Sequence, residues 1–177
     1  MLRVYLDQNK WIDLARAATG HPLGAPYVDA LEVARAAVVN GTASFPLDMF
    51  RYAETGKRSH ARSRNDVADV MIELSHQHTM ALGRDILPAE LDRALKVRFD
   101  RPEHPSQVEV FGVGIEHVTK KRVTWPEFDP SKLPAGIPTE EYPKLKETFQ
   151  TIVEGELLRV GPEELPPRSA HEDCRGA

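Results

Sequence analysis

The chain has 177 residues, of which 41% are hydrophobic and 28% charged, and its formal net charge at pH 7 is −4. This length suffices for one domain with a packed core, and so mild a charge excludes a global nucleic-acid-binding charge pattern. The single cysteine, Cys174, excludes an intramolecular disulfide and a cysteine-rich zinc module, which favours a reducing compartment. No apolar run is long enough to cross a membrane, and Asp7 and Lys10 interrupt any secretory pattern. We therefore expect a cytoplasmic protein with no membrane contact.

The first hundred residues carry the clearest patterns of regular structure. Residues 2–6 suit a short buried strand, because β-branched and aromatic side chains pack well on a pleated surface. Apolar residues at helical spacing then predict helices near residues 9–18 and over about 27–39. Residues 42–45 predict a second short strand. This strand–helix–helix–strand order favours a parallel pair of strands joined by a right-handed crossover.

Further helices are predicted along the rest of the chain. Asp48 is a suitable N-cap for a third helix, and residues 63–79 form the clearest amphipathic pattern of the chain. Pro88 is placed to begin a helix that runs to about Phe99, because proline favours the first helical position. Alternation within residues 108–118 favours a strand weakly, and residues 139–159 predict a last helix.

Proline content divides the chain into a regular and an irregular part. Ten of the fourteen prolines follow residue 100, so the regular structure is expected before it. We expect an α/β core over residues 1–100 and a loop-rich extension of the same domain over 101–160. Residues 161–177 are expected to form a disordered tail.

Two carboxylates are placed where an α/β sheet would bind a metal. Asp7 stands at the carboxyl end of the first predicted strand, the edge at which open α/β sheets bind ligands. Glu54 lies near the end of the helix that follows the second strand, and parallel strands would bring it close to Asp7. Such a pair is the usual way to hold Mg²⁺ or Mn²⁺ with water completing the octahedron. Two alternatives remain open: Asp7 or Asn9 simply caps the next helix, and Glu54 is a solvated surface residue.

A basic segment follows the second strand, and Glu54 is the only acidic residue within it. This segment favours a rim that contacts RNA phosphates without reading the sequence. The alternative is a solvated loop whose cations face the carbonyl dipoles of helix ends. The cations of this segment are Arg51, Lys57, Arg58, Arg62 and Arg64, of which Arg58, Arg62 and Arg64 are the candidate RNA contacts.

The residues around both carboxylates resemble a known family. The run from Val4 to Leu14 resembles the opening strand and metal aspartate of PIN-domain ribonucleases, in which an Asp-x-Asn step follows the first strand. The segment from Phe45 to Thr55 resembles PIN-like proteins in which a Glu-Thr step carries the second acidic ligand. The two segments together span roughly residues 1–80, a little under half of the chain.

This resemblance implies a parallel sheet wrapped by helices and a divalent-metal-dependent ribonuclease that hydrolyses RNA phosphodiesters. Asp7 would be a direct metal ligand, Glu54 a second ligand either directly or through water, and Asn9 would orient Asp7 or a metal-bound water. Such proteins often act as toxins or defence nucleases. The partners implied are RNA and either an antitoxin, a partner subunit or a second copy of the chain.

One feature of the family pattern is missing. PIN nucleases supply a third acidic residue, and often a fourth, from strand ends in the C-terminal half, and no such step follows residue 100 here. The alternative function is therefore a catalytically degenerate PIN-like scaffold that binds RNA or a protein partner. A further alternative is a subunit completed by another chain. Acidic residues that could substitute are Asp85, Glu90, Asp92, Asp100, Glu116 and Asp129.

Overall fold

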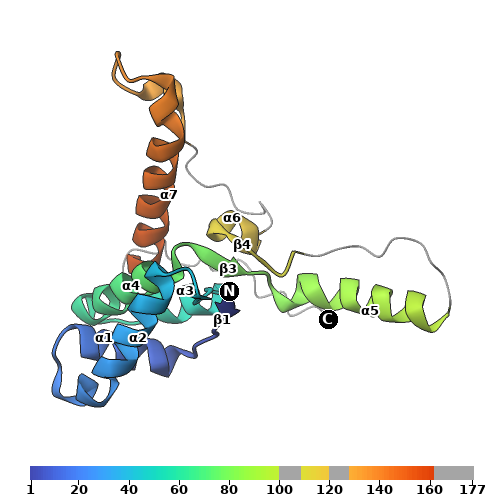
Figure 1. The fold of residues 1–177 in the computed structure, drawn as a ribbon, viewed down its shortest axis with the longest axis horizontal. Coiled ribbons are helices and arrows are strands. Elements are labelled where there is room, and N and C mark those ends of the chain that lie inside the picture. Colours follow the sequence, from blue (N-terminus) through green and yellow to red (C-terminus); the bar gives the residue numbers. More distant parts are fainter. Residues whose placement is uncertain (100–108, 120–127, 162–177) are drawn as a thin grey trace, which may run out of the picture.

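The computed structural model describes residues 1–99, 109–119 and 128–161. Within them the protein is a mixed α/β structure in which helices predominate (Figure 1). Short 3₁₀ helices lie at η1 (Pro22–Tyr27), η2 (Pro130–Lys132) and η3 (Thr139–Glu141). The α-helices are α1 (Gln8–Ala18), α2 (Val28–Val39), α3 (Met49–Gly56), α4 (Ala61–Ser75), α5 (Gly83–Arg98), α6 (Gly114–Thr119) and α7 (Tyr142–Arg159).

The strands form two small pairs. Strand β1 (Leu2–Arg3) runs parallel to β2 (Ala43–Ser44), and β3 (His78–Met80) runs antiparallel to β4 (Phe111–Val113). A parallel bridge between Leu47 and Thr79 joins the two pairs, with Leu47 N donating to His78 O over 2.9 Å. The segment after β2 therefore holds both halves of the sheet together.

The core lies where α1, α2 and α4 pack together. Trp11 on α1, Leu31 on α2 and Met71 on α4 are almost fully buried, and they form one cluster with Leu47 after β2 and Leu158 on α7. Burying large apolar side chains is the main favourable term in folding, at about 1.5–3 kcal/mol each. Helix α4 is central, because it contacts α1 on one side and α7 on the other.

Helices α5 and α7 extend away from this cluster (Figure 1). Helix α5 has no buried residue, whereas α7 buries Leu158 and Glu154 at its carboxyl-terminal end against the other helices. None of the helices within the described residues is long and apolar enough to span a membrane.

Several local predictions are confirmed. The helices predicted near 9–18, 27–39 and 139–159 correspond to α1, α2 and α7, and the strands predicted at 2–6 and 42–45 pair in parallel as β1 and β2. Asp48 is the N-cap of α3. These features depend on short-range signals, namely apolar periodicity and capping side chains, which the sequence displays directly.

The fold class is mixed α/β, but a PIN-like parallel sheet is not confirmed. Among the described residues, the one parallel pair of strands is β1 with β2, whereas a PIN-like sheet contains several parallel strands. The first strand is also shorter than predicted and is exposed instead of buried, since β1 lies beside β2 alone. A parallel strand needs covering helices on both faces to be buried, and β1 lacks this cover.

Three other boundaries differ from the prediction. The helix predicted over 63–79 ends at Ser75, because His76 and Gln77 adopt positive φ angles of 46° and 61° that terminate it before β3. Helix α5 begins at Gly83, so Pro88 lies inside the helix instead of starting it. In the stretch predicted over 108–118, residue 108 lies outside the described residues, and the rest contains β4 and most of α6. The tail predicted from residue 161 lies, except for Gly161, outside the described residues.

Candidate metal and nucleic-acid site

Asp7 begins helix α1. Its backbone is extended, and its Oδ1 accepts a hydrogen bond from Lys10 N at 2.9 Å. An N-cap of this kind satisfies a helix N–H group that has no intrahelical partner. Asp7 is therefore the N-cap of α1, and its side chain is exposed. Asn9 lies in the first turn of α1 and is also exposed.

Asp48 occupies the equivalent position after β2, and both of its carboxylate oxygens are engaged. Oδ1 accepts from Arg51 N at 2.9 Å, and Oδ2 accepts from the Tyr5 hydroxyl at 2.9 Å. Burial and the Asp48 carboxylate raise the pKa of Tyr5, which keeps its hydroxyl a donor. Asp48 therefore ties the chain after β1 to the start of α3.

Arg51 links Asp48 to Glu54. Its side chain is 8% exposed, with Nε 3.6 Å from Asp48 Oδ1 and Nη2 2.9 Å from Glu54 Oε2. The same guanidinium lies 5.7 Å from the ring centroid of Tyr5. A guanidinium removed from water needs opposite charge close by, and the two carboxylates supply it.

A hydrogen bond joins the beginning of α1 to the end of α3. Gln8 Nε2 donates to Thr55 Oγ1 at 3.1 Å. Gln8 follows Asp7 in the sequence and Thr55 follows Glu54, so this contact holds the backbones that carry both predicted metal ligands. The parallel pairing of β1 with β2 is the reason, since it directs both following helices to one edge of the sheet.

The free oxygens at this edge belong to the two predicted ligands. Within the described residues, Asp7 Oδ2 and Glu54 Oε1 have no hydrogen-bond partner, whereas both oxygens of Asp48 are committed. Magnesium typically binds one or two protein carboxylates and keeps several waters. Asp7 and Glu54 therefore fit such an ion by their chemistry. No group of three His, Cys, Asp or Glu side chains suited to a metal occurs in the part of the chain that is described.

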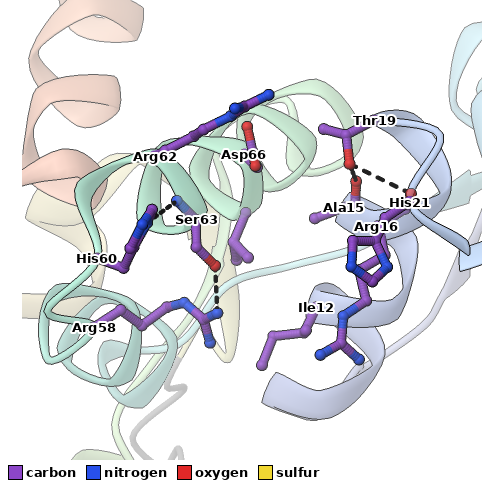
Figure 2. Close-up of a pocket in the computed structure, with 11 residues that line it drawn as sticks. Ile12, Ala15, Arg16, Thr19, His21, Arg58, His60, Arg62, Ser63 and Asp66 are labelled. Carbon is purple, nitrogen blue, oxygen red and sulfur yellow. Dashed lines mark hydrogen bonds between the residues drawn. The ribbon is translucent and has the colours of Figure 1, made fainter. Parts of the chain in front are cut away.

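A pocket of about 430 Å³ opens between α1 and the start of α4 (Figure 2). Helix α1 and the loop after it form one wall, and the α3–α4 loop with the first turns of α4 forms the other. Its lining residues are Ile12, Ala15, Arg16, Thr19, His21, Arg58, His60, Arg62, Ser63, Asp66 and Val67.

The three predicted RNA contacts lie in different surroundings. Arg58 and Arg62 both line the pocket, with Arg58 Nη2 donating to Ser63 Oγ at 2.6 Å and Arg62 exposed. Arg64 is 1% exposed, and it donates to the main-chain oxygens of Arg58 and Arg159. Arg64 therefore supports the fold at this site, and it is not among the residues that line the pocket.

Sequence reasoning missed several residues of this region. Tyr5 and Gln8 contact α3 through side-chain hydrogen bonds, and Arg16, His21 and His60 line the pocket. Gln8, Ile12 and Arg16 repeat at intervals of four, so a helical-wheel reading could have placed them on one face of α1. Nothing in the sequence shows which other segment this face meets.

The protein is thus a mixed α/β structure in which Asp7 and Glu54 follow two parallel strands and a pocket with three arginines lies between α1 and α4. Comparison of the chain with protein-family models, curated proteins and solved structures finds no match in any of the three.

Proposed function

We propose that the protein is a divalent-metal-dependent ribonuclease, with Asp7 and Glu54 as metal ligands. The observation that carries the proposal is the Gln8–Thr55 hydrogen bond at 3.1 Å, which holds the two ligand-bearing backbones together at the carboxyl ends of two parallel strands. Each ligand keeps one uncommitted oxygen, as a Mg²⁺ or Mn²⁺ site with mostly water ligands requires.

Each residue at the edge has a separate part in this function. A divalent ion bound there would stabilise negative charge on the phosphate oxygens and lower the pKa of water. Asp7 holds its free oxygen in place through the cap to Lys10 N, and Arg51 fixes Glu54 by its ion pair. Asp48 is fully engaged and keeps Arg51 in position. Asn9 is exposed in the first turn of α1, where it can orient a water beside Asp7.

The basic pocket supports RNA as the substrate class. Gln8 and Ile12 lie one turn apart on the same face of α1, about 6 Å along the helix axis, so the pocket begins next to the carboxylate edge. Arginines that contact phosphates fix the register of a nucleic-acid strand without reading its bases. Arg58 and Arg62 have that role in this proposal.

Calorimetric titration of Mn²⁺ into the full chain and into Asp7→Asn tests the metal site. The substitution removes the charge and keeps the shape, and an asparagine still caps α1. We expect Mn²⁺ binding and Mn²⁺-dependent cleavage of RNA by the parent protein, and loss of both in Asp7→Asn. Asp13→Asn is the matched control, since Asp13 pairs with Lys10 on α1 away from the edge.

A catalytically degenerate scaffold predicts a different result for Mn²⁺ and RNA binding. It is favoured by the finding that Asp7 and Glu54 are joined by no third metal-binding side chain among the described residues. RNA binding without Mn²⁺ binding, unchanged in Asp7→Asn, would replace the nuclease with an RNA-binding scaffold.

A further inference from the structure

The pocket between α1 and α4 presents an excess of hydrogen-bond donors. Arg16, Arg58 and Arg62 line it, and Asp66 is the one carboxylate among its lining residues. Arg62 and Asp66 lie four residues apart on α4, and Arg16 Nη1 lies 3.6 Å from Asp13 Oδ1 on α1. Two carboxylates therefore stand against three cations, and the Arg58 guanidinium has no carboxylate partner among the described residues. The excess of positive charge suits an anionic ligand.

Two histidines add neutral donors to the same pocket. His21 Nδ1 accepts from Leu23 N at 3.1 Å, and His60 Nδ1 accepts from Ser63 N at 3.4 Å. An imidazole that accepts at Nδ1 carries its proton on Nε2, so each of these rings has an Nε2–H group to donate. His60 is also the N-cap of the 15-residue helix α4, whose N-terminal dipole favours an anion.

The positions of these donors are set by contacts within the fold. Arg58 Nη2 donates to Ser63 Oγ at 2.6 Å, and Arg58 O accepts from the buried Arg64. Figure 2 shows Arg16 and Arg58 on opposite walls, at the same end of the pocket. Charged donors held in this way bind an oxyanion with little loss of side-chain freedom.

The pocket also has an apolar part and the size of a small-molecule site. Ile12, Ala15 and Val67 contribute apolar surface between the two walls. A volume of about 430 Å³ falls within the range of about 300–1,000 Å³ usual for ligand pockets, and it exceeds what a phosphate ion needs. Apolar surface beside several anion donors matches a nucleoside joined to a phosphate.

We propose that this pocket binds a nucleotide through its terminal phosphate, with Arg16 and Arg58 on the phosphate and the nucleoside against Ile12, Ala15 and Val67. Arg62 lies at the other end of the pocket, beside Asp66, and adds positive charge there (Figure 2). A phosphomonoester offers three terminal oxygens to these donors, one more than an internal phosphodiester. This inference rests on the proposed function in taking RNA as the substrate class. The nucleotide is the end of an RNA strand or a free mononucleotide, which share this chemistry.

The test is calorimetric titration of adenosine 5′-monophosphate, adenosine and inorganic phosphate into the full chain. The buffer contains EDTA, so the result is independent of the metal site. We expect the monophosphate to bind at least about tenfold more tightly than either fragment, because it alone engages both parts of the pocket. Phosphate binding as tightly as the monophosphate, or no binding of the monophosphate, would overturn the proposal.

Single variants assign this binding to the pocket. Arg16→Gln and Arg62→Gln each remove one cation. The Arg16 side chain is 41% exposed and Arg62 is exposed, so neither substitution disturbs the core. We expect Arg16→Gln to weaken monophosphate binding about tenfold, the effect of losing one charge-assisted contact, and Arg62→Gln to weaken it less. The matched control is Arg84→Gln, an exposed arginine on α5 outside the pocket lining, which should bind as the parent does. Equal binding by all four proteins would refute the assignment.

Short RNAs show whether the bound nucleotide is the end of an RNA strand or a free mononucleotide. Three RNAs are compared, which carry a 5′-phosphate, a 3′-phosphate or hydroxyls at both ends. Tighter binding of one phosphorylated RNA, lost in Arg16→Gln, assigns the pocket to that strand end. Equal binding of all three RNAs excludes the strand end and assigns the pocket to a free nucleotide. Metal-dependent cleavage without monophosphate binding overturns this inference alone, whereas monophosphate binding without Mn²⁺ binding overturns the nuclease alone.

Discussion

The guanidinium of Arg64 donates from Nε to the main-chain oxygen of Arg159, 95 residues further along the chain, over 2.6 Å. Its Nη1 donates to Arg58 O, also at 2.6 Å. Gly161 packs so closely on this group that a Cβ at that position would overlap it. One buried side chain thus joins α4 to the end of α7 and to the loop that carries Arg58.

Replacing Arg64 should therefore cost stability. Arg64→Ala leaves two part-buried carbonyl groups without these donors and opens a cavity where the buried side chain was, so we expect the free energy of unfolding to fall by about 2–4 kcal/mol. Arg62→Ala, two residues earlier and exposed, should change it by less than about 0.5 kcal/mol. Urea denaturation of both variants measures the difference. Equal stabilities would show that Arg64 does not hold the fold in this way.

The raised pKa of Glu154 implies that the free energy of unfolding falls as the pH rises. Burial raises the pKa of Glu154 to about 7 from 4.5, and the nearby Glu116 carboxylate adds to the rise, against hydrogen bonds from Ile115 N and the Tyr52 hydroxyl that lower it. The folded state therefore binds more protons than the unfolded state between these values. We expect the free energy of unfolding to decrease by about 3 kcal/mol between pH 4.5 and 7 on this account.

The substitution Glu154→Gln isolates this effect. Glutamine resembles the protonated acid and can still accept from Ile115 N, so its stability should vary less over the same pH range. Urea denaturation at pH 5 and pH 8 compares it with the parent. The variant should be the more stable protein at pH 8, and a parallel decline in both would locate the pH dependence elsewhere.

The close packing of Gly24 on helix α1 supports the position of the neighbouring pocket residue His21. A Cβ on Gly24 would overlap the backbone of Arg16 and Ala17, because η1 lies directly against α1 there. Gly24→Ala should displace the loop that carries His21, cost about 1–3 kcal/mol, and weaken nucleotide binding. Gly83→Ala is the control, since a Cβ at Gly83 meets nothing within 4 Å. Thermal unfolding of the two variants checks this expectation.

Replacing Arg62 should change the salt dependence of RNA binding. Each phosphate contact releases counterions, so Arg62→Gln should make the slope of log affinity against log salt concentration shallower by about 1. Fluorescence anisotropy of a labelled RNA at several salt concentrations gives the slope. Arg84→Gln should leave it unchanged, and a slope in Arg62→Gln equal to that of the parent would remove Arg62 from the RNA contacts.

The local structure of the first eighty residues could be predicted because its signals are short-ranged. Asp48 precedes an apolar helical pattern and caps α3. The apolar stripe of α4 is buried as its spacing requires, with Met71 and Leu74 at 0% exposure. The prediction for α4 went wrong at its end, where His76 and Gln77 adopt positive φ, a conformation that no periodicity reveals.

The sequence by itself determined most of the helices and the N-cap at Asp48, because these depend on residues close together in the chain. The parallel order of β1 and β2 followed from the strand–helix–helix–strand order and the preference for right-handed crossovers. Only the tertiary structure decided the partners of individual polar groups. Arg62 and Arg64 look alike in the sequence, yet one faces a pocket and the other bonds to a helix end 95 residues away. Likewise, Asp48 accepts a hydrogen bond from Tyr5, which lies 43 residues earlier in the chain, whereas one oxygen of Asp7 has no such partner among the described residues. Such choices follow from which distant segments pack together, and short-range patterns do not encode that.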